Sequence, residues 1–76
     1  MGDPTRMSAR QHHIVVNGVA TATHAQTLAE LLVALGYGAT KVATAVDGTF
    51  VAERARAGHR LAEGASIEIV APRQGG

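Results

Sequence analysis

The sequence has 76 residues, of which 46% are hydrophobic and 17% are charged, and its formal net charge is +1. These values are typical of one small folded domain, because disordered chains combine low hydrophobicity with a high net charge. Cysteine is absent, which excludes disulfides, thiol nucleophiles and cysteine-ligated metals and suits a cytoplasmic protein. With no tryptophan, little net charge and no apolar run near the about 20 residues of a membrane span, we expect neither nucleic acid nor a membrane as a partner.

The N-terminal region predicts a flexible leader followed by a β-hairpin. Residues 1–11 contain Gly, Pro, Ser and charged residues without periodicity, so we expect them to be flexible. The β-branched run Ile14-Val15-Val16 and the run Val19–Thr23 then flank Asn17-Gly18. An Asn-Gly pair between two such runs predicts a type I′ turn, because both central residues of this turn need a positive φ.

An amphipathic helix is predicted after this hairpin. Thr27-Leu28-Ala29-Glu30 has the pattern of a capping box, in which the Thr hydroxyl accepts from the Glu amide and the Glu side chain accepts from the Thr amide. Leucines at positions 28, 31, 32 and 35 then form one helical face. Gly36 or Gly38 is expected to end the helix in the left-handed conformation, which glycine adopts most readily.

Strands are predicted again in the second half of the chain. Residues 42–46 and 49–51 flank Asp47-Gly48, which predicts a second hairpin. The charged stretch of residues 53–60 is interpreted as a solvated loop or a short helical turn, with a docking patch for an acidic partner surface as the alternative. Residues 66–71 alternate up to a proline and carry apolar residues on both faces, which predicts a central strand parallel to the first strand.

Together these elements predict an α+β domain over residues 12–71, in which one amphipathic helix packs on one face of a mixed four- to five-stranded sheet. The larger apolar residues with suitable periodicity are predicted to form its core: Ile14, Val16, Leu28, Leu31, Leu32, Leu35, Val42, Val46, Leu61, Ile67 and Ile69. Four residues that alternate onto the opposite face are predicted to form an apolar surface that docks a partner: Ala43, Ala45, Phe50 and Val70. Residues 72–76 are expected to form a mobile tail.

Motifs for catalysis or cofactor binding are missing from the sequence. It contains no phosphate-binding Gly-rich loop, no HExxH zinc motif and no nucleophile elbow. His12 and His13 are adjacent and would point to opposite faces of a strand, while His24 and His59 stand apart, so surface histidines are expected rather than metal ligands. We therefore expect no catalytic residue, no metal and no bound cofactor in this chain.

The glycine pair Gly75-Gly76 is the exception among these candidates. Glycine has no Cβ, so the pair could enter a narrow channel and adopt whatever φ and ψ the channel imposes. A carboxylate at Gly76 becomes an electrophile only after activation, for example as an acyl-adenylate in the nucleotide site of another protein. Arg73 and Gln74 would thread into that site with the glycines, while the domain docks outside. A frayed end without function is the alternative.

From His12 to Gly76, the sequence resembles the sulfur carrier proteins of thiamin biosynthesis, the ThiS family, within the ubiquitin-like β-grasp superfamily. The matching segments occur with the family's order and spacing: Val16-Asn17-Gly18, Thr27-Leu28-Ala29-Glu30-Leu31-Leu32, residues 42–48, residues 61–70 and Gly75-Gly76. The sequence differs from the family pattern after the second hairpin, where the family has Val-Pro-Arg and then a Trp. This chain has Ala52, Glu53 and Arg56 at the Pro, Arg and Trp positions, so its partner surface could differ.

The resemblance implies a β-grasp fold and a carrier rather than an enzyme. Gly76 would be adenylated with ATP by an E1-like adenylating enzyme, converted to a thiocarboxylate with sulfur from a sulfur donor protein, and would give that sulfur to thiazole synthase. The same fold and chemistry would serve the small subunit of molybdopterin synthase or a carrier of another sulfur pathway. A ubiquitin-like protein modifier would use the same diglycine to acylate lysines, and an interaction module with an incidental diglycine is the remaining alternative.

Overall fold

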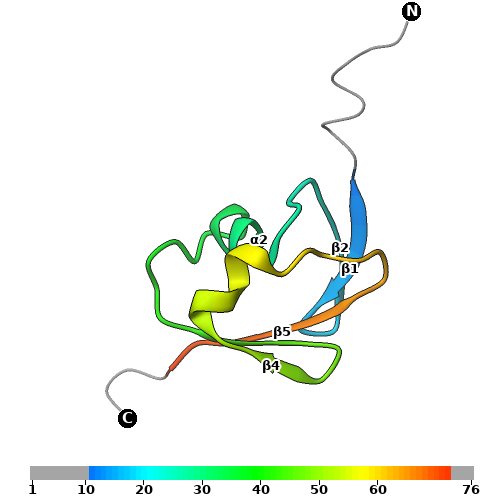
Figure 1. Cartoon of the computed structure of the whole chain (residues 1–76). Helices are drawn as coiled ribbons and strands as arrows, with labels where there is room; N and C mark the ends of the chain where they lie inside the picture. Colours follow the sequence, from blue (N-terminus) through cyan, green and yellow to red (C-terminus); the bar gives the residue numbers. More distant parts are fainter. Residues whose placement is uncertain (1–10, 73–76) are drawn as a thin grey trace, which may run out of the picture.

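A computed structural model describes residues 11–72 of the chain. Residues 1–10 of the predicted leader and residues 73–76 of the predicted tail lie outside the described residues. Within residues 11–72 the elements follow in this order (Figure 1): β1 (His12–Val16), β2 (Val19–Thr23), α2 (Leu28–Ala34), β3 (Ala43–Val46), β4 (Thr49–Val51), the 3-10 helix η1 (Glu53–Gly58) and β5 (Ser66–Val70).

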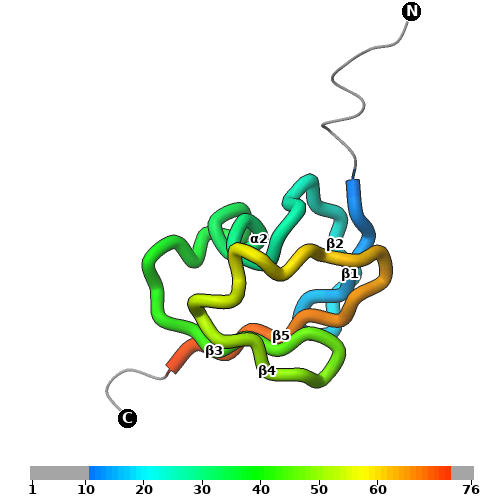
Figure 2. Tube along the Cα trace, in the orientation of Figure 1, coloured from blue at the N-terminus to red at the C-terminus, as the bar shows by residue number. Residues whose placement is uncertain are grey.

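The strands of the described region form one mixed sheet in the order β2-β1-β5-β3-β4. β5 is central, parallel to β1 and antiparallel to β3. Figure 2 shows how the chain places the helix and η1 on one side of this sheet. The predicted α+β fold and the predicted central, parallel position of the last strand are therefore confirmed. The part of the chain between Gln11 and Pro72 contains no helix with the length and apolar character that a membrane crossing needs.

Both hairpins turn on residues with positive φ. Asn17 and Gly18 have φ angles of 49° and 83°, and Asp47 and Gly48 have φ angles of 50° and 84°. Positive φ at both central positions identifies type I′ turns, whose twist matches that of the flanking strands. Both turns are therefore confirmed as the sequence predicts them.

The N-terminus of α2 is capped by side chains, with one difference from the prediction. The Glu30 amide donates to Thr27 Oγ1 at 3.2 Å, which confirms one half of the capping box. The Glu30 carboxylate accepts from the Gln26 amide at 2.7 Å and not from the Thr27 amide. The prediction for the second bond of the capping box was therefore wrong, because its donor is the residue before the predicted one. The segment before α2 is held by an isolated antiparallel bridge between Thr27 and Arg60, in which the Leu28 amide donates to the His59 carbonyl and the Leu61 amide donates to the Gln26 carbonyl, both at 2.9 Å.

The C-terminus of α2 is closed by a glycine in the left-handed conformation. Gly36 has a φ of 92°. Its amide donates to the Val33 carbonyl at 3.0 Å, and the Tyr37 amide donates to the Leu32 carbonyl at 2.9 Å. This pair of bonds is a Schellman motif, which satisfies carbonyls that the helix end would otherwise leave unpaired. The predicted glycine stop is confirmed and is assigned to Gly36.

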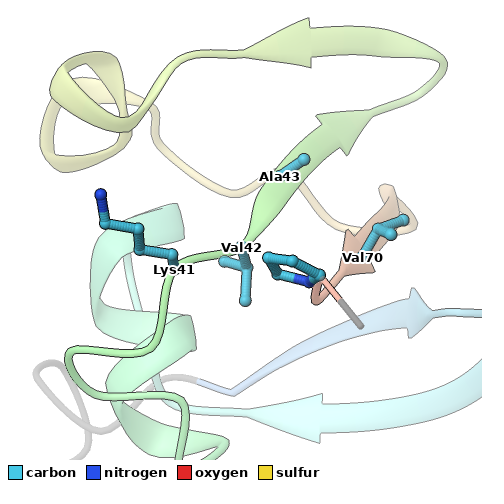
Figure 3. Close-up of a pocket in the computed structure, with 5 residues that line it drawn as sticks. Lys41, Val42, Ala43 and Val70 are labelled. Carbon is cyan, nitrogen blue, oxygen red and sulfur yellow. The ribbon is translucent and has the colours of Figure 1, made fainter. Parts of the chain in front are cut away.

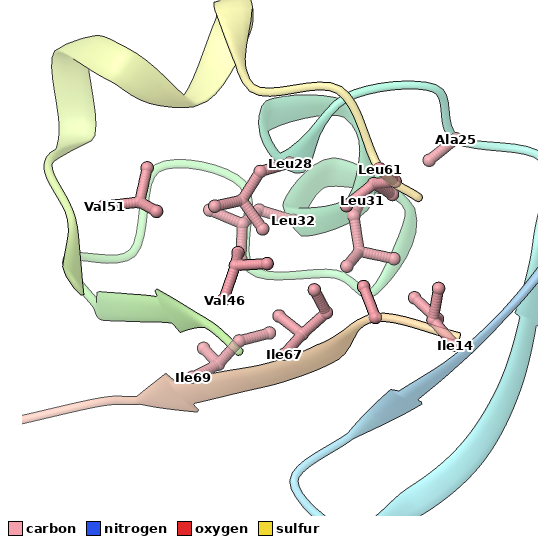
Figure 4. Close-up of a cluster of buried hydrophobic side chains, with 11 residues drawn as sticks. Ile14, Ala25, Leu28, Leu31, Leu32, Val46, Val51, Leu61, Ile67 and Ile69 are labelled. Atoms are coloured by element: carbon pink, nitrogen blue, oxygen red, sulfur yellow. The ribbon is translucent and has the colours of Figure 1, made fainter. Parts of the chain in front are cut away.

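The core lies between α2 and the inner face of the sheet (Figure 4). Its buried apolar residues are Ile14, Ala25, Leu28, Leu31, Leu32, Val46, Val51, Leu61, Ala65, Ile67 and Ile69. Most of the predicted core is among them, and Val16 and Val42 are partly buried against it. The prediction was wrong for Leu35, which is 38% exposed. α2 ends at Ala34, and after the turn Tyr37 packs against the core in place of Leu35.

The charged stretch after β4 forms the 3-10 helix η1, and one of its arginines is buried. Arg56 is only 8% exposed. Its Nε donates to Thr44 Oγ1 at 3.0 Å, and its Nη2 donates to the Val42 carbonyl at 2.6 Å. Thr44 Oγ1 donates in turn to the Val51 carbonyl at 2.8 Å. The short helical turn agrees with the prediction, but the interpretation as a solvated stretch was wrong at Arg56, which ties η1 to β3.

Candidate functional site

The face of the sheet opposite α2 carries the residues predicted to dock a partner. Ala43 of β3 pairs with Val70 of β5, and Ala45 of β3 pairs with Phe50 of β4. Thr44, which lies between the two alanines, is buried, so the four paired side chains project to the outer face. Phe50 and Val70 are 69% and 64% exposed. We refer to Ala43, Ala45, Phe50 and Val70 as the apolar patch.

A groove of about 360 Å³ adjoins the apolar patch where the chain leaves β5. It is lined by Lys41, Val42, Ala43, Val70 and Pro72 (Figure 3). The sequence reasoning missed this groove, because it forms only when the loop before β3 meets the end of β5. Lys41 is the single lysine of the sequence, which is the one feature that could have drawn attention to the loop.

The predicted reactive end begins beside this groove. Pro72 is the last described residue, and Arg73, Gln74, Gly75 and Gly76 lie outside the described residues. Their predicted threading into a partner therefore stays a prediction. A four-residue segment spans at most about 14 Å when fully extended. Gly76 can therefore lie no further than about that distance from Pro72 and the groove.

The outer face has the chemistry of a recognition surface. An apolar patch exposed on a small domain is typical of an interface, because removing apolar surface from water lowers the free energy. Two charged residues lie next to the patch: Lys41 lines the groove, and Glu68 of β5 pairs with Ala45. This arrangement can bind a partner through apolar contact.

The histidines do not combine into a site. His13 Nδ1 lies 3.0 Å from Glu63 Oε2, and the His13 amide donates to Glu63 Oε1 at 3.0 Å. The bond from this amide is the main reason that the pKa of Glu63 lies below its ordinary value of 4.5, and the His13 ring lowers it further. His12 Nε2 lies 3.4 Å from Gln26 Oε1. Among residues 11–72, no three His, Cys, Asp or Glu side chains gather where they could hold a metal ion.

Comparisons with known proteins agree with the fold. A protein-family model described as the ThiS family matches residues 9–76. Among solved structures, the crystal structure of the thiamine biosynthesis protein (ThiS) from Geobacter metallireducens is similar, with a TM-score of 0.69 and 25% sequence identity. The similarity covers 84% of this chain and 99% of that chain, so the β-grasp fold expected from the resemblance is confirmed. A search of curated proteins found no significant match.

Proposed function

This chain belongs to the ThiS family, and on that premise we propose that it is a sulfur carrier protein of thiamin biosynthesis rather than an enzyme. The observation that carries the proposal is the family match, which extends through residue 76. The similar solved structure is that of a thiamine biosynthesis protein, which this chain spans almost completely. We expect the carrier to act in the cytoplasm, because a sequence without cysteine has no disulfides and is compatible with a reducing compartment.

The proposed chemistry takes place at the carboxyl group of Gly76. This group is ionised at neutral pH and resists nucleophiles, so an E1-like adenylating enzyme would first transfer AMP from ATP to a carboxylate oxygen and release pyrophosphate. Hydrosulfide from a sulfur donor then attacks the carbonyl carbon, AMP leaves with the bonding electron pair, and loss of a proton gives the thiocarboxylate. Thiazole synthase is the proposed acceptor of this sulfur. The partner consumes the ATP, and the carrier itself needs no bound cofactor.

The apolar patch is the surface on which we propose that the adenylating enzyme docks. It lies on the sheet face opposite α2, and it shares Ala43 and Val70 with the groove beside Pro72. An enzyme seated over both would need a channel no longer than about 14 Å to reach Gly76 from Pro72. Gly75 would suit such a channel, because glycine carries no side chain to clash with its walls.

Intact-mass spectrometry of the full chain tests the proposal. Incubation with the adenylating enzyme, ATP and sulfide should raise the mass by about 16 Da, because sulfur replaces one carboxylate oxygen. Deletion of Gly76 withdraws the carboxylate by about 3.5 Å and should abolish this gain. Deletion of residues 1–6 is the matched control at the other end of the chain and should leave the gain unchanged.

Each other outcome leads to a different conclusion. A Gly76 deletion that still acquires sulfur would overturn the proposal. A covalent ladder on other proteins would indicate a ubiquitin-like modifier, and the absence of any product would indicate an interaction module. Sulfur transfer to a molybdopterin synthase large subunit, but not to thiazole synthase, would move the carrier to that pathway.

A further inference from the structure

The parallel pairing of β1 with β5 is extended by a side chain beyond the end of β1. The Val15 amide donates to the Ala65 carbonyl at 2.9 Å, and the Asn17 amide donates to the Ile67 carbonyl at 2.9 Å. The next acceptor in this series is the Ile69 carbonyl, and it accepts from Asn17 Nδ2 at 3.2 Å. The Ile69 amide donates back to Asn17 Oδ1 at 2.8 Å.

The Asn17 carboxamide therefore replaces a peptide group of β1. The main chain cannot continue the pairing, because it reverses at the type I′ turn of Asn17-Gly18. A carboxamide offers one carbonyl oxygen and an N–H donor, as a peptide group does, so it can satisfy both main-chain groups of Ile69. An aspartate would retain the acceptor but lose the donor, and a glycine would lose both.

We propose that Asn17 is a positioning residue for the transfer reaction at Gly76. Ile69 is the penultimate residue of β5, and its neighbour Val70 belongs to both the apolar patch and the groove. By holding Ile69 on the β1 side, Asn17 fixes where Val70 lies and from which point the chain leaves the sheet toward Gly76. This inference rests on the proposed function, since it assigns Asn17 the task of presenting the reactive end to the docked adenylating enzyme.

The other hairpin provides a matched comparison at the opposite end of the same strand. Asp47 has almost the same φ as Asn17 in the same type of turn. Its amide donates to the Ser66 carbonyl at 2.8 Å, and its Oδ1 accepts from the Ser66 amide at 2.9 Å. Ser66 begins β5, far along the strand from Pro72. Each turn thus holds one end of β5, and the turn of Asn17 holds the end next to the reactive segment, where β3 also pairs with β5 through Ala43 and Val70.

The test compares Asn17→Gly with Asp47→Gly, since glycine accepts the positive φ of both turns. The rate of pyrophosphate release by the adenylating enzyme is measured at varied carrier concentration. Asn17→Gly should lower kcat by about tenfold or more, because the point from which the chain leaves the sheet toward Gly76 is no longer fixed, and it should also raise KM, because Val70 belongs to the proposed docking surface. Asp47→Gly should change neither value by more than about twofold. Asn17→Asp keeps the acceptor for the Ile69 amide, so its kcat should fall between the two.

Amide hydrogen exchange on the free variants provides the independent readout. Exchange at Ile69 should accelerate in Asn17→Gly, and exchange at Ser66 should accelerate in Asp47→Gly. A normal kcat in Asn17→Gly together with faster exchange at Ile69 would overturn the proposal, because Asn17 would then be structural only. If Asn17→Gly fails to fold, a normal kcat in folded Asn17→Asp overturns the proposal in the same way. If the wild-type chain is not adenylated at all, it is the proposed function that fails.

Discussion

The two faces of the sheet use the same strands for different tasks. In β5, Ile67 and Ile69 are buried under α2, whereas Glu68 and Val70 are exposed on the outer face. The inner face belongs to a packed core, and the outer face carries the apolar patch, whose largest side chain is mostly exposed. Because the two faces make different contacts, mutations on one face should change stability and mutations on the other should change partner binding.

The largest expected effect is on the inner face, at the helix that covers it. Leu31 is fully buried, so Leu31→Ala should lower the free energy of unfolding by about 2–5 kcal/mol. Val33 lies on the same helix but is 68% exposed, and Val33→Ala should change it by less than about 0.5 kcal/mol. Urea unfolding followed by circular dichroism measures both. Equal losses in the two variants would contradict the assignment of the buried face.

A smaller loss is expected where η1 closes the edge of the core. Arg56→Ala removes the buried guanidinium and its bonds to Thr44 and Val42, which should cost about 1.5–3 kcal/mol. Arg54→Ala changes an exposed arginine of the same 3-10 helix and should cost less than about 0.5 kcal/mol. Thermal unfolding of the two variants makes the comparison. A stable Arg56→Ala would mean that water replaces the guanidinium at no cost.

On the outer face, the expected effect is on binding and not on folding. Phe50→Asp should weaken binding to the adenylating enzyme by about tenfold or more, as the loss of an aromatic anchor does. Val19→Asp is the control, because Val19 is similarly exposed at 64% but pairs with Val16 on the other face. Calorimetric titration gives both affinities, with circular dichroism to check folding. An unchanged affinity in Phe50→Asp would remove the apolar patch from the proposal.

The smallest effect is expected at the exposed contact between His13 and Glu63. Because the pKa of Glu63 is lowered by folding, this contact stabilises the fold above pH 4.5 and loses its contribution as the pH falls through the lower folded value. Glu63→Gln removes the charge, so wild type should be slightly more stable than the variant near about pH 6, and this difference should disappear as the pH is lowered through the folded pKa of Glu63, which lies below 4.5. Thermal midpoints over this pH range measure the difference. A difference that persists at the lower pH would show that the charge is not its cause.

The local elements of the fold were predictable from the sequence because their signals are local. The pairs Asn17-Gly18 and Asp47-Gly48 need only their own positive φ, and the glycine after α2 needs only a helix end. Even the central position of β5 followed from apolar residues on both of its faces. The face on which Phe50 lies followed from strand alternation alone.

The features that sequence reasoning missed depend on distant partners. Arg56 was predicted to lie in a solvated stretch. Its burial depends on a hydroxyl and a carbonyl of residues 12 and 14 positions earlier, which the local sequence does not indicate. Leu35 fits the leucine periodicity, but the position at which the chain turns away decides its exposure. The groove needs the loop before β3 and the end of β5, which are far apart in the sequence, to lie side by side. The roles of Arg73, Gln74, Gly75 and Gly76 stay predictions, since they lie outside the described residues.

The parallel pairing of β1 with β5 has a consequence for how the protein is synthesised. Among the strands of residues 11–72, β5 is the last to leave the ribosome, and it supplies Ile67 and Ile69 to the centre of the core. A nascent chain that stops before Ser66 cannot join its two hairpins into one sheet, so it should stay open to proteases. Chains that survive as folded protein have therefore been translated at least to Val70, six residues before Gly76. Folding thus removes chains that end before β5 is complete.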